Sequence, residues 1–348
     1  MTAKSSSGNF RRILIIVLLL AAGVGGWVGW NMFFRGNVQT KDHSPEFLYI
    51  RTGSTMEDLL KLLEAKELIK DKASFEWMAK LKKFETVKPG RYRIRDGMSN
   101  RELINILNNG LQEKVEFTFN EVYTKEQMAG RVGAKLEADS TEILELLNDN
   151  DFLNKYGLSS ENVMTLFMPD KYSFNWNTSA EEFFQSMAKV YKDFWTDERK
   201  QLAKSIGLSQ TEAITLASIV EAEQRRYAEE RPTIAGLYMN RLNDGMPLQS
   251  DPTVIYALGD FKIQRVLRGD LDVNSPYNTY RFKGLPPGPI RLPQPESIDA
   301  VLNYKRNNYL YMCAEFGTGK HKFTSSYDQH LKNAKAYQDA MDKANINR

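Results

Sequence analysis

Cysteine and histidine are scarce in this chain of 348 residues, which has one cysteine, Cys313, and three histidines, His43, His321 and His330. A single cysteine excludes an internal disulfide and a cysteine-rich zinc site. Three histidines provide little material for a metal centre or a Ser-His-Asp triad. We therefore expect neither a metal nor a cofactor, and any chemistry must come from carboxylates, hydroxyls, amides and the backbone.

A large excess of charge is also missing. The 47 Lys and Arg residues nearly balance the 44 Asp and Glu residues, for a net charge of +3. Four of the basic residues and no acidic residue lie within positions 1–35, which leaves 43 basic against 44 acidic residues, a net charge of −1, in the remainder. A near-neutral body lacks the broad basic surface of a nucleic-acid-binding protein.

One long apolar segment is present near the N-terminus. Residues 13–34 are 22 consecutive uncharged residues rich in Ile, Leu and Val. A helix of that length crosses a hydrocarbon core of about 30 Å. Trp27, Trp30, Phe33 and Phe34 lie near its far end, where aromatic residues mark a membrane interface. We predict an uncleaved transmembrane helix over residues 13–34.

The basic residues of the N-terminus precede this segment, so the positive-inside rule places residues 1–12 in the cytoplasm and residues 36–348 outside the plasma membrane. The alternative is a cleaved signal peptide with Ala21-Ala22-Gly23 as its small-residue site. The hydrophobic region of a signal peptide is short, whereas this apolar run continues to the aromatic end, which favours the anchor.

Two segments after the apolar run share one pattern. Ile50-Arg-Thr-Gly-Ser-Thr-Met-Glu-Asp-Leu-Leu-Lys-Leu-Leu63 realigns 44 positions later with Ile94-Arg-Asp-Gly-Met-Ser-Asn-Arg-Glu-Leu-Ile-Asn-Ile-Leu107. Each copy is typical of a short strand, a Gly turn, a polar cap and a helix. Residues 115–128 resemble a degenerate third copy. Two clear copies are too few for a solenoid, so we predict a small α+β module over residues 47–111, either a spacer or a ligand-binding unit.

Capping boxes predict two helices in the C-terminal part. Ser179 with Glu182 opens a helix that we expect to reach about Ala203, and Ser209 with Glu212 opens a helix from Gln210 to about Arg226. Apolar residues form one stripe of the second helix, namely Ala213, Leu216, Ala217 and Val220.

Two carboxylates, Glu221 and Glu223, flank this stripe on opposite sides, each at an expected half-buried rim. A carboxyl group at an apolar rim holds its proton nearer neutrality and suits general-acid work. Glutamates on the surface of helices are far commoner than catalytic ones, and the spacing does not choose between the two.

The following loops are rich in amides, hydroxyls and tyrosines stiffened by Pro and Gly. They are Met246–Gly259, Ser275–Arg281 and Gly284–Ile290. Such loops suit a sugar-like ligand, whose hydroxyls need polar partners and whose flat faces stack on aromatic rings. A rigid structural connector is the alternative for the Pro286-Pro287 segment.

Several ordered motifs resemble the signatures of the endolytic murein transglycosylase family, and they extend over nearly the whole exported chain. They are Ala217-Ser-Ile-Val-Glu-Ala-Glu223, Asn240-Arg241-Leu242, Leu248-Gln-Ser-Asp-Pro-Thr-Val-Ile-Tyr256, Tyr277-Asn-Thr-Tyr280, Gly284-Leu-Pro-Pro-Gly-Pro-Ile290, Tyr309-Leu-Tyr-Met312, His321-Lys-Phe323 and His330. The resemblance implies an α+β protein: an inner-membrane anchor, a LysM-like module over residues 47–111, and a mainly helical α+β catalytic domain over residues 115–340 that acts on nascent peptidoglycan.

The resemblance also implies the roles of individual residues. It assigns the catalytic acid to the first glutamate of the Ser-Ile-Val-Glu segment, Glu221, rather than to Glu223. Seven motif residues are expected to line the substrate cleft, namely Gln249, Ser250, Asp251, Thr253, Tyr256, Tyr277 and Asn278. For Asp251 we keep two alternatives: its carboxylate caps the helix that Pro252 begins, or it orients Gln249 or a sugar hydroxyl in the cleft.

The chain departs from the family pattern in two places. Met164-Thr-Leu-Phe-Met-Pro-Asp-Lys-Tyr172 lacks the acidic Leu-Glu-Gly-type lead of the family, and Asn120-Glu-Val122 replaces a Pro-Glu-Gly-like turn. The first departure removes an acidic residue from the cleft wall near Asp170.

The implied reaction is cleavage of the bond between N-acetylmuramic acid and N-acetylglucosamine, in which the muramic acid C6 hydroxyl attacks and leaves a 1,6-anhydro end. One glutamate then donates and accepts the proton, and no metal, nucleotide or redox cofactor is required. The implied partners are glycan strands and peptidoglycan synthases of the same membrane. The competing hypotheses are a non-catalytic peptidoglycan-binding scaffold and a hydrolase.

Overall fold

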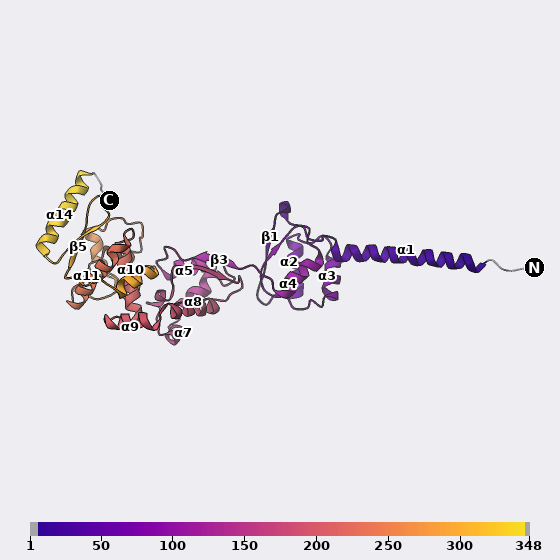
Figure 1. Ribbon diagram of the computed structural model, residues 1–348, viewed down its shortest axis with the longest axis horizontal. Helices are drawn as coiled ribbons and strands as arrows, with labels where there is room; N and C mark the ends of the chain where they lie inside the picture. Colours follow the sequence, from indigo (N-terminus) through magenta and orange to yellow (C-terminus); the bar gives the residue numbers. More distant parts are fainter. Residues whose placement is uncertain (1–5, 345–348) are drawn as a thin grey trace, which may run out of the picture. The chain divides into compact units, whose positions relative to one another are not determined.

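The structure, a computed structural model, describes residues 6–344 (Figure 1). Within the N-terminal helix, the side chains at positions 6–10, 21, 24, 25, 28, 29 and 31–33 lie outside the described set. The chain divides into two compact units. Unit 1 comprises Met1–Val115 with Ser173–Thr178, and unit 2 comprises Glu116–Tyr172 with Ser179–Arg348.

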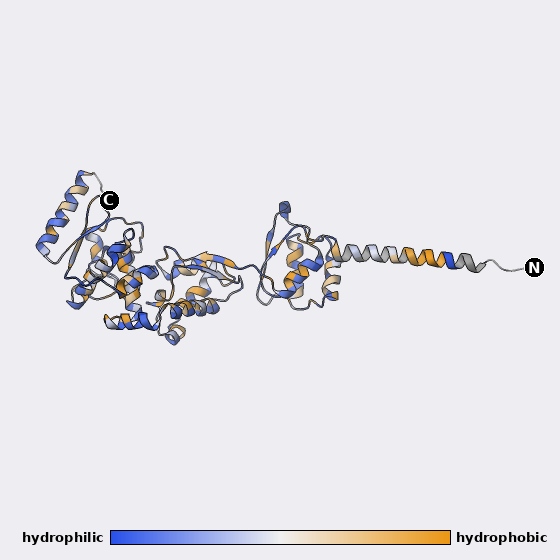
Figure 2. Cartoon of the chain, viewed as in Figure 1, coloured by the Kyte–Doolittle hydropathy of each residue, from blue (hydrophilic) through white to orange (hydrophobic). Residues whose placement is uncertain are grey.

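The N-terminal helix α1 (Ser6–Phe34) contains the predicted transmembrane segment. Its described side chains from Ile13 to Leu20 are between 48% and 67% exposed, and this stretch is orange in Figure 2. Among the described residues, no helix combines the length and the apolarity that a membrane crossing requires. Part of the 13–34 segment, and the first residues of the expected cytoplasmic segment 1–12, lie outside the described set, so the anchor stays a prediction.

Unit 1 is a small α+β body, as the repeated pattern predicts. Its elements after α1 are η1 (Lys41–His43), β1 (Glu46–Ile50), α2 (Met56–Ala65), α3 (Lys72–Leu81), β2 (Gly90–Ile94) and α4 (Asn100–Asn109). Strands β1 and β2 pair antiparallel, with Leu48 opposite Tyr92, and both of these side chains are fully buried. The predicted order of strand, cap and helix is confirmed in both copies. The LysM-like character of the module stays a prediction.

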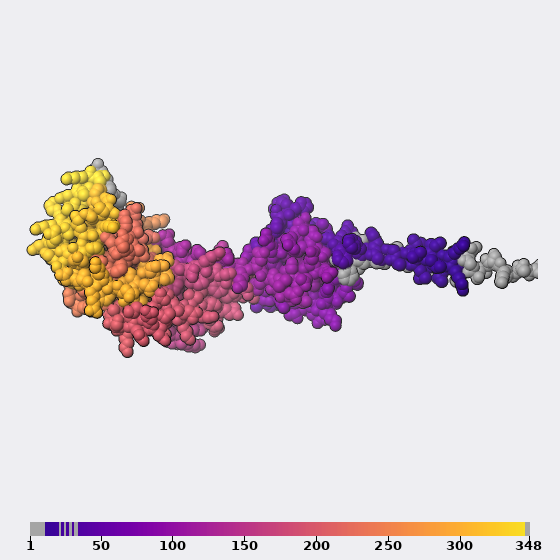
Figure 3. Space-filling model, viewed as in Figure 1, coloured from indigo at the N-terminus to yellow at the C-terminus, as the bar shows by residue number. Residues whose placement is uncertain are grey.

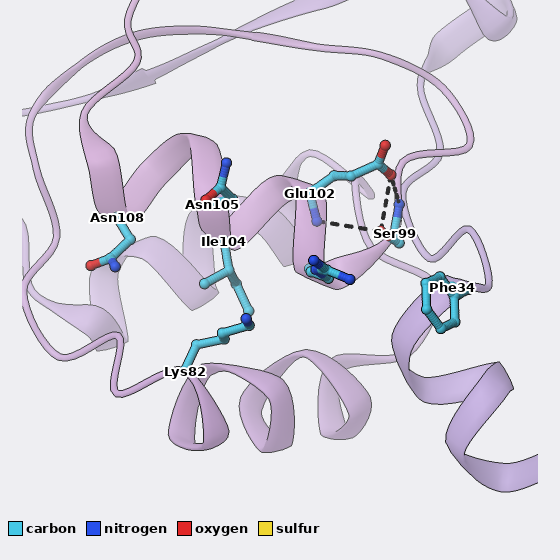
Figure 4. A pocket seen from close by; sticks show the side chains of 8 residues that line it. Phe34, Lys82, Ser99, Glu102, Ile104, Asn105 and Asn108 are labelled. Atoms are coloured by element: carbon cyan, nitrogen blue, oxygen red, sulfur yellow. Dashed lines mark hydrogen bonds between the residues drawn. The ribbon is translucent and has the colours of Figure 1, made fainter. Parts of the chain in front are cut away.

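The caps of the two copies are equivalent. Thr55 begins α2 and Ser99 begins α4, each in a complete capping box with the acidic residue three positions later. Figure 4 shows the second of these boxes, in which Ser99 and Glu102 bond each other at the edge of a cavity of about 530 Å³. The box engages Glu102, the one carboxylate among the described residues that line this cavity.

The degenerate third copy also folds as a strand followed by a capped helix. Strand β3 (Val115–Thr118) pairs with β4 (Lys171–Phe174), and Thr124 caps α5 (Lys125–Gly133).

Unit 2 is mainly helical. Its further elements are α6 (Ser140–Asn148), α7 (Asn150–Leu153), η2 (Asn154–Tyr156), η3 (Val163–Leu166), α8 (Ala180–Phe194), α9 (Asp197–Ser205), α10 (Gln210–Glu223), η4 (Ala228–Glu230), α11 (Arg231–Asn243), α12 (Asp251–Leu258), η5 (Arg268–Asp272), α13 (Pro295–Leu302), β5 (Tyr311–Ala314), β6 (His321–Thr324) and α14 (Tyr327–Lys343). Strands β5 and β6 form an antiparallel pair. The predicted mainly helical α+β class is thus confirmed for this unit.

The predicted helix from Ser179 to about Ala203 is wrong in length. Its capping box is present, but α8 ends at Phe194 because Trp195 leaves the helical conformation and inserts into the core with 1% exposure. Thr196 then caps a separate helix, α9.

Helix α10 lies at the centre of the unit 2 core. The capping box of Ser209 and Glu212 is confirmed, but the helix ends at Glu223 instead of Arg226 because Gln224 adopts φ −130° and ψ 89°. Every residue from Ala213 to Glu221 is buried, so the expected single apolar stripe is wrong. The middle of the helix is surrounded on all sides, and only its first and last turns reach an accessible surface.

Candidate active site

The two glutamates at the end of α10 lie in different environments. Glu221 is 3% exposed and its Oε2 accepts hydrogen bonds from the backbone N–H of Gln294 and the hydroxyl of Ser297, both at 2.6 Å. Its Oε1 lies 3.3 Å from Nε of Arg291, whose side chain is 9% exposed. Helix α10 packs against α13, the helix that carries Ser297. Glu221 therefore connects α10 to the segment 291–297 as a buried structural ion pair.

Glu223 instead faces a cavity of about 650 Å³. Its Oε1 accepts hydrogen bonds from the hydroxyl of Tyr238 on α11, at 2.8 Å, and from the hydroxyl of Ser250, at 2.5 Å. Burial raises the pKa of Glu223, and the charge of Asp251 raises it further, while the two hydroxyl donors act in the opposite direction. Both donors use the same carboxyl oxygen, and among the described residues no donor contacts Oε2. Burial therefore favours the protonated form of the carboxyl group, and Oε2 is left without a protein donor among the described residues.

Ser250 occupies a helix-capping position without capping the helix. It is the residue before α12, but its side chain makes no cap hydrogen bond and bonds Glu223 instead. Since serine at this position ordinarily bonds the first turn of the helix, its hydrogen bond to Glu223 gives up local helix stability to hold that carboxyl group. This is a feature of a functional site more than of a scaffold.

Asp251 lines the same cavity. It is the first residue of α12, and its Oδ1 accepts a hydrogen bond from the hydroxyl of Tyr280 at 2.6 Å. The contact with Tyr280, and the absence of a side-chain cap at the start of α12, favour the orienting role over the capping role. Burial raises the pKa of Asp251, and the Tyr280 hydroxyl lowers it in part.

Gln249 lines the cavity in a strained conformation, with φ 54°, a left-handed value that non-glycine residues rarely adopt. Its backbone N–H bonds the carbonyl of Thr279 at 3.1 Å, and its side-chain oxygen accepts a hydrogen bond from Arg241. Arg241 is itself fixed by the carbonyls of Pro247 and Leu310. With its oxygen engaged, the Gln249 side chain can offer its amide donors to an acceptor on a ligand.

Two of the expected cleft residues support the loop from beneath instead of facing the cavity. Thr253 and Asn278 are fully buried. The hydroxyl of Thr253 bonds the Ser250 carbonyl and the Thr279 hydroxyl, and the Asn278 amide bonds the carbonyls of Leu271 and Val273.

Tyr256 and Tyr277 lie against each other, with ring centroids 4.5 Å apart, and neither is among the described residues that line the cavity. Burial raises the pKa of both hydroxyls. Of the eight predicted site residues, the structure therefore places Gln249 and Asp251 on the cavity and Ser250 against Glu223. Glu221, Thr253, Tyr256, Tyr277 and Asn278 lie elsewhere in unit 2.

Several cavity residues were not among those predicted. They are Tyr238, Arg241, Gln264, Arg265, Tyr280, Tyr311, His321, Tyr327, His330 and Tyr337. Five of them lie in motifs that carry the family resemblance, but motif membership does not distinguish a residue that faces the cavity from one that supports it. Those from α14 lie on a helix with no buried residue, which forms part of the yellow surface in Figure 3.

Comparison with known proteins agrees with the motifs. An endolytic murein transglycosylase of Bacillus subtilis (strain 168) is 30% identical over 304 residues, 83% of each chain. An endolytic murein transglycosylase of Streptococcus pneumoniae (serotype 2, strain D39) is 28% identical over 92% of this chain, which spans 64% of that protein's length. A crystal structure of a yceG-like protein from Listeria monocytogenes matches with a TM-score of 0.55 and 28% identity, over 83% of this chain and 98% of that one.

The resemblance to endolytic murein transglycosylases is thereby confirmed at the level of the family. The model of the YceG-like family matches residues 48–336, most of both units. The chain belongs to the YceG-like family.

Proposed function

We propose that this protein is an endolytic lytic transglycosylase that cleaves the β-1,4 bond between N-acetylmuramic acid and N-acetylglucosamine within glycan strands, and that Glu223 is its acid. The observation that supports this assignment is the environment of Glu223. Its carboxyl group lies at the end of a buried helix, faces a cavity of about 650 Å³, has its pKa raised by burial and keeps one oxygen clear of protein donors.

The assignment of the acid to Glu221, which the family resemblance implied, finds no support in this geometry. Both oxygens of Glu221 are engaged, by Gln294, Ser297 and Arg291. Glu221 is also buried away from the cavity that Glu223 lines. We therefore move the catalytic role to Glu223.

One carboxyl group can perform both proton transfers of the proposed reaction. Protonated Glu223 donates to the glycosidic oxygen, and the carboxylate that remains can take the proton of the muramic acid C6 hydroxyl as that oxygen attacks C1. Because the nucleophile belongs to the substrate, positioning replaces the activation of a water molecule. The aromatic residues of the cavity and the amide donors of Gln249 suit the faces and the acetamido oxygens of the sugars.

A hydrolase is the second candidate, and Asp251 is the observation that favours it. A glycoside hydrolase ordinarily uses two carboxyl groups, and Asp251 lines the same cavity as Glu223. A short hydrogen bond from Tyr280 engages Asp251, and this bond favours an orienting role over that of a base or nucleophile.

Digestion of purified peptidoglycan tests the proposal. The full chain, purified in mild detergent, should release muropeptides with 1,6-anhydro ends that mass spectrometry identifies, and Glu223→Gln should release almost none. Reducing ends made with water would support the hydrolase, and strand binding without any product would support a non-catalytic scaffold.

The proposal extends to the place of the protein in the cell. The exposed apolar side chains of α1 and the basic residues before them support a single-pass inner-membrane anchor with the N-terminus in the cytoplasm and residues 36–348 outside. From there the enzyme would cut nascent strands beside peptidoglycan synthases and limit their length.

A further inference from the structure

A histidine faces the cavity beside the acid. His321 is the first residue of β6, its side chain is 11% exposed, and it lines the cavity that Glu223 lines. The two groups are close enough that a protonated His321 would lower the pKa of Glu223. The proton transfers proposed above make no use of this imidazole.

A carboxylate fixes the orientation of the His321 ring. Nδ1 lies 3.0 Å from Oε2 of Glu230, and the backbone N–H of His321 donates to Oε1 of the same carboxylate at 3.2 Å. An ionised carboxylate only accepts hydrogen bonds, so the neutral ring carries its proton on Nδ1. Nε2 then has a free lone pair, and no described residue donates to it. A histidine oriented by a carboxylate in this way is a general base in other enzymes.

Glu230 is held in turn by the residue that follows the acid. The Gln224 side chain donates to Oε2 of Glu230 at 2.7 Å and to the carbonyl of Gly319 at 3.0 Å. Its own oxygen accepts from the backbone N–H groups of Arg226 and Tyr227. One side chain therefore connects the end of α10, where Glu223 lies, with the loop before β6, where His321 lies, so that the acid and the imidazole share one rigid support.

We propose that His321 is the general base of the second proton transfer. This inference rests on the proposed function and changes only the identity of the group that receives the C6 proton. The proton of Glu223 goes to the leaving O4, which departs with the electron pair of the C1–O4 bond. O6 then bonds C1 with its own lone pair, and its proton passes to Nε2. The imidazolium, stabilised by Glu230, returns that proton through solvent, and Glu223 takes up another.

The stereochemistry of the product is compatible with an acid and a base that line the same cavity. The broken bond is β, and the 1,6-anhydro bridge closes on the same face of the ring, so the acid and the base must approach from one side. Hydrogen bonds from Tyr238 and Ser250 already engage Oε1 of Glu223, whereas the Nε2 atom of His321 accepts no hydrogen bond among the described residues. The other charged or titratable groups on this cavity include Asp251, Arg241 and His330.

The pH dependence of kcat/KM for formation of anhydro ends tests the inference. In the wild type, activity should rise with pH as the base loses its proton and fall again as Glu223 does. His321→Gln in the full chain should lower kcat/KM at pH 7 by about 10²-fold, a usual share of general base catalysis, and should abolish the rise on the acidic side. Glu230→Gln should keep the rise but move its midpoint to lower pH, because the imidazolium loses its partner.

His43→Gln is the matched control, since His43 pairs with Asp96 in unit 1 and should leave the profile unchanged. A rise of kcat/KM on the acidic side that persists in His321→Gln, or whose midpoint does not move in Glu230→Gln, would overturn the role of His321 and leave the proposed function intact. A wild type that forms no anhydro ends would instead refute the proposed function itself.

Discussion

Exchanging the two glutamates of α10 for glutamine, one at a time, should separate stability from catalysis. Glu221→Gln removes the charge opposite Arg291, whose side chain is 9% exposed and whose Nε makes no hydrogen bond among the described residues. Breaking a buried ion pair by removing one partner costs about 3–5 kcal/mol. Glutamine keeps an acceptor for Gln294 and Ser297, so we expect the lower end, about 3 kcal/mol. For a domain of the size of unit 2 this corresponds to a fall in Tm of about 6–12 °C.

Glu223→Gln should leave the stability intact and reduce the turnover. The amide oxygen still accepts from Tyr238 and Ser250, and a group that is unfavourable to ionise is replaced by a neutral one. The Tm should therefore hold or rise, while turnover falls by about 10²–10⁴-fold because the acid is gone.

Differential scanning fluorimetry gives the Tm values, and release of soluble muropeptides at 20 °C, where both variants are folded, gives the turnover. A Glu221→Gln enzyme that is stable and inactive, beside a Glu223→Gln enzyme that is active, would refute the reasoning and return the acid to Glu221.

Four further outcomes are expected. Asp251→Asn should keep the Tm and reduce turnover at least tenfold, about 1.4 kcal/mol of transition-state stabilisation; full activity would remove Asp251 from the site. The pKa of Glu223 is higher in the folded than in the unfolded chain, so the stability that its protonated form contributes is present below about pH 4.3 and is lost as pH rises through the folded value. The Tm of Glu223→Gln minus the Tm of the wild type should therefore increase between pH 4 and pH 8. A constant Tm difference would contradict the burial of the Glu223 charge. Thr253→Val should destabilise the enzyme by about 1–3 kcal/mol, seen as a lower midpoint in urea, with turnover per folded molecule little changed. Cell fractionation should find the protein in the membrane, and a soluble product cut near Ala22 would restore the signal peptide.

Local patterns predicted the parts of the fold that depend on neighbouring residues. The capping boxes at Ser179 and Ser209 and the repeated strand, cap and helix were readable because each depends on a contact three residues away. The C-terminal end of α10 could not be predicted from neighbouring residues. Gln224 leaves the helix and bonds Glu230 and Gly319, and the second of these contacts spans 95 positions.

In the site, too, local motifs were predictable and long-range contacts were not. The structure brings two residues of one predicted motif, Gln249 and Asp251, to the cavity and places Ser250 against Glu223. The choice between Glu221 and Glu223 depends on Arg291, Gln294 and Ser297, which lie 70 or more positions away. No period or spacing within α10 encodes that contact, so the sequence placed both carboxylates at equivalent rims although one is a buried ion pair and the other faces a cavity.

The most direct test of the account is to digest peptidoglycan with the wild-type enzyme in ¹⁸O-labelled water and to examine the new saccharide ends by mass spectrometry. Because the proposed nucleophile is the substrate's own C6 hydroxyl, we predict anhydro ends without ¹⁸O, and no such ends from Glu223→Gln. New reducing ends that carry ¹⁸O would show that water is the nucleophile and would contradict the proposed transglycosylase.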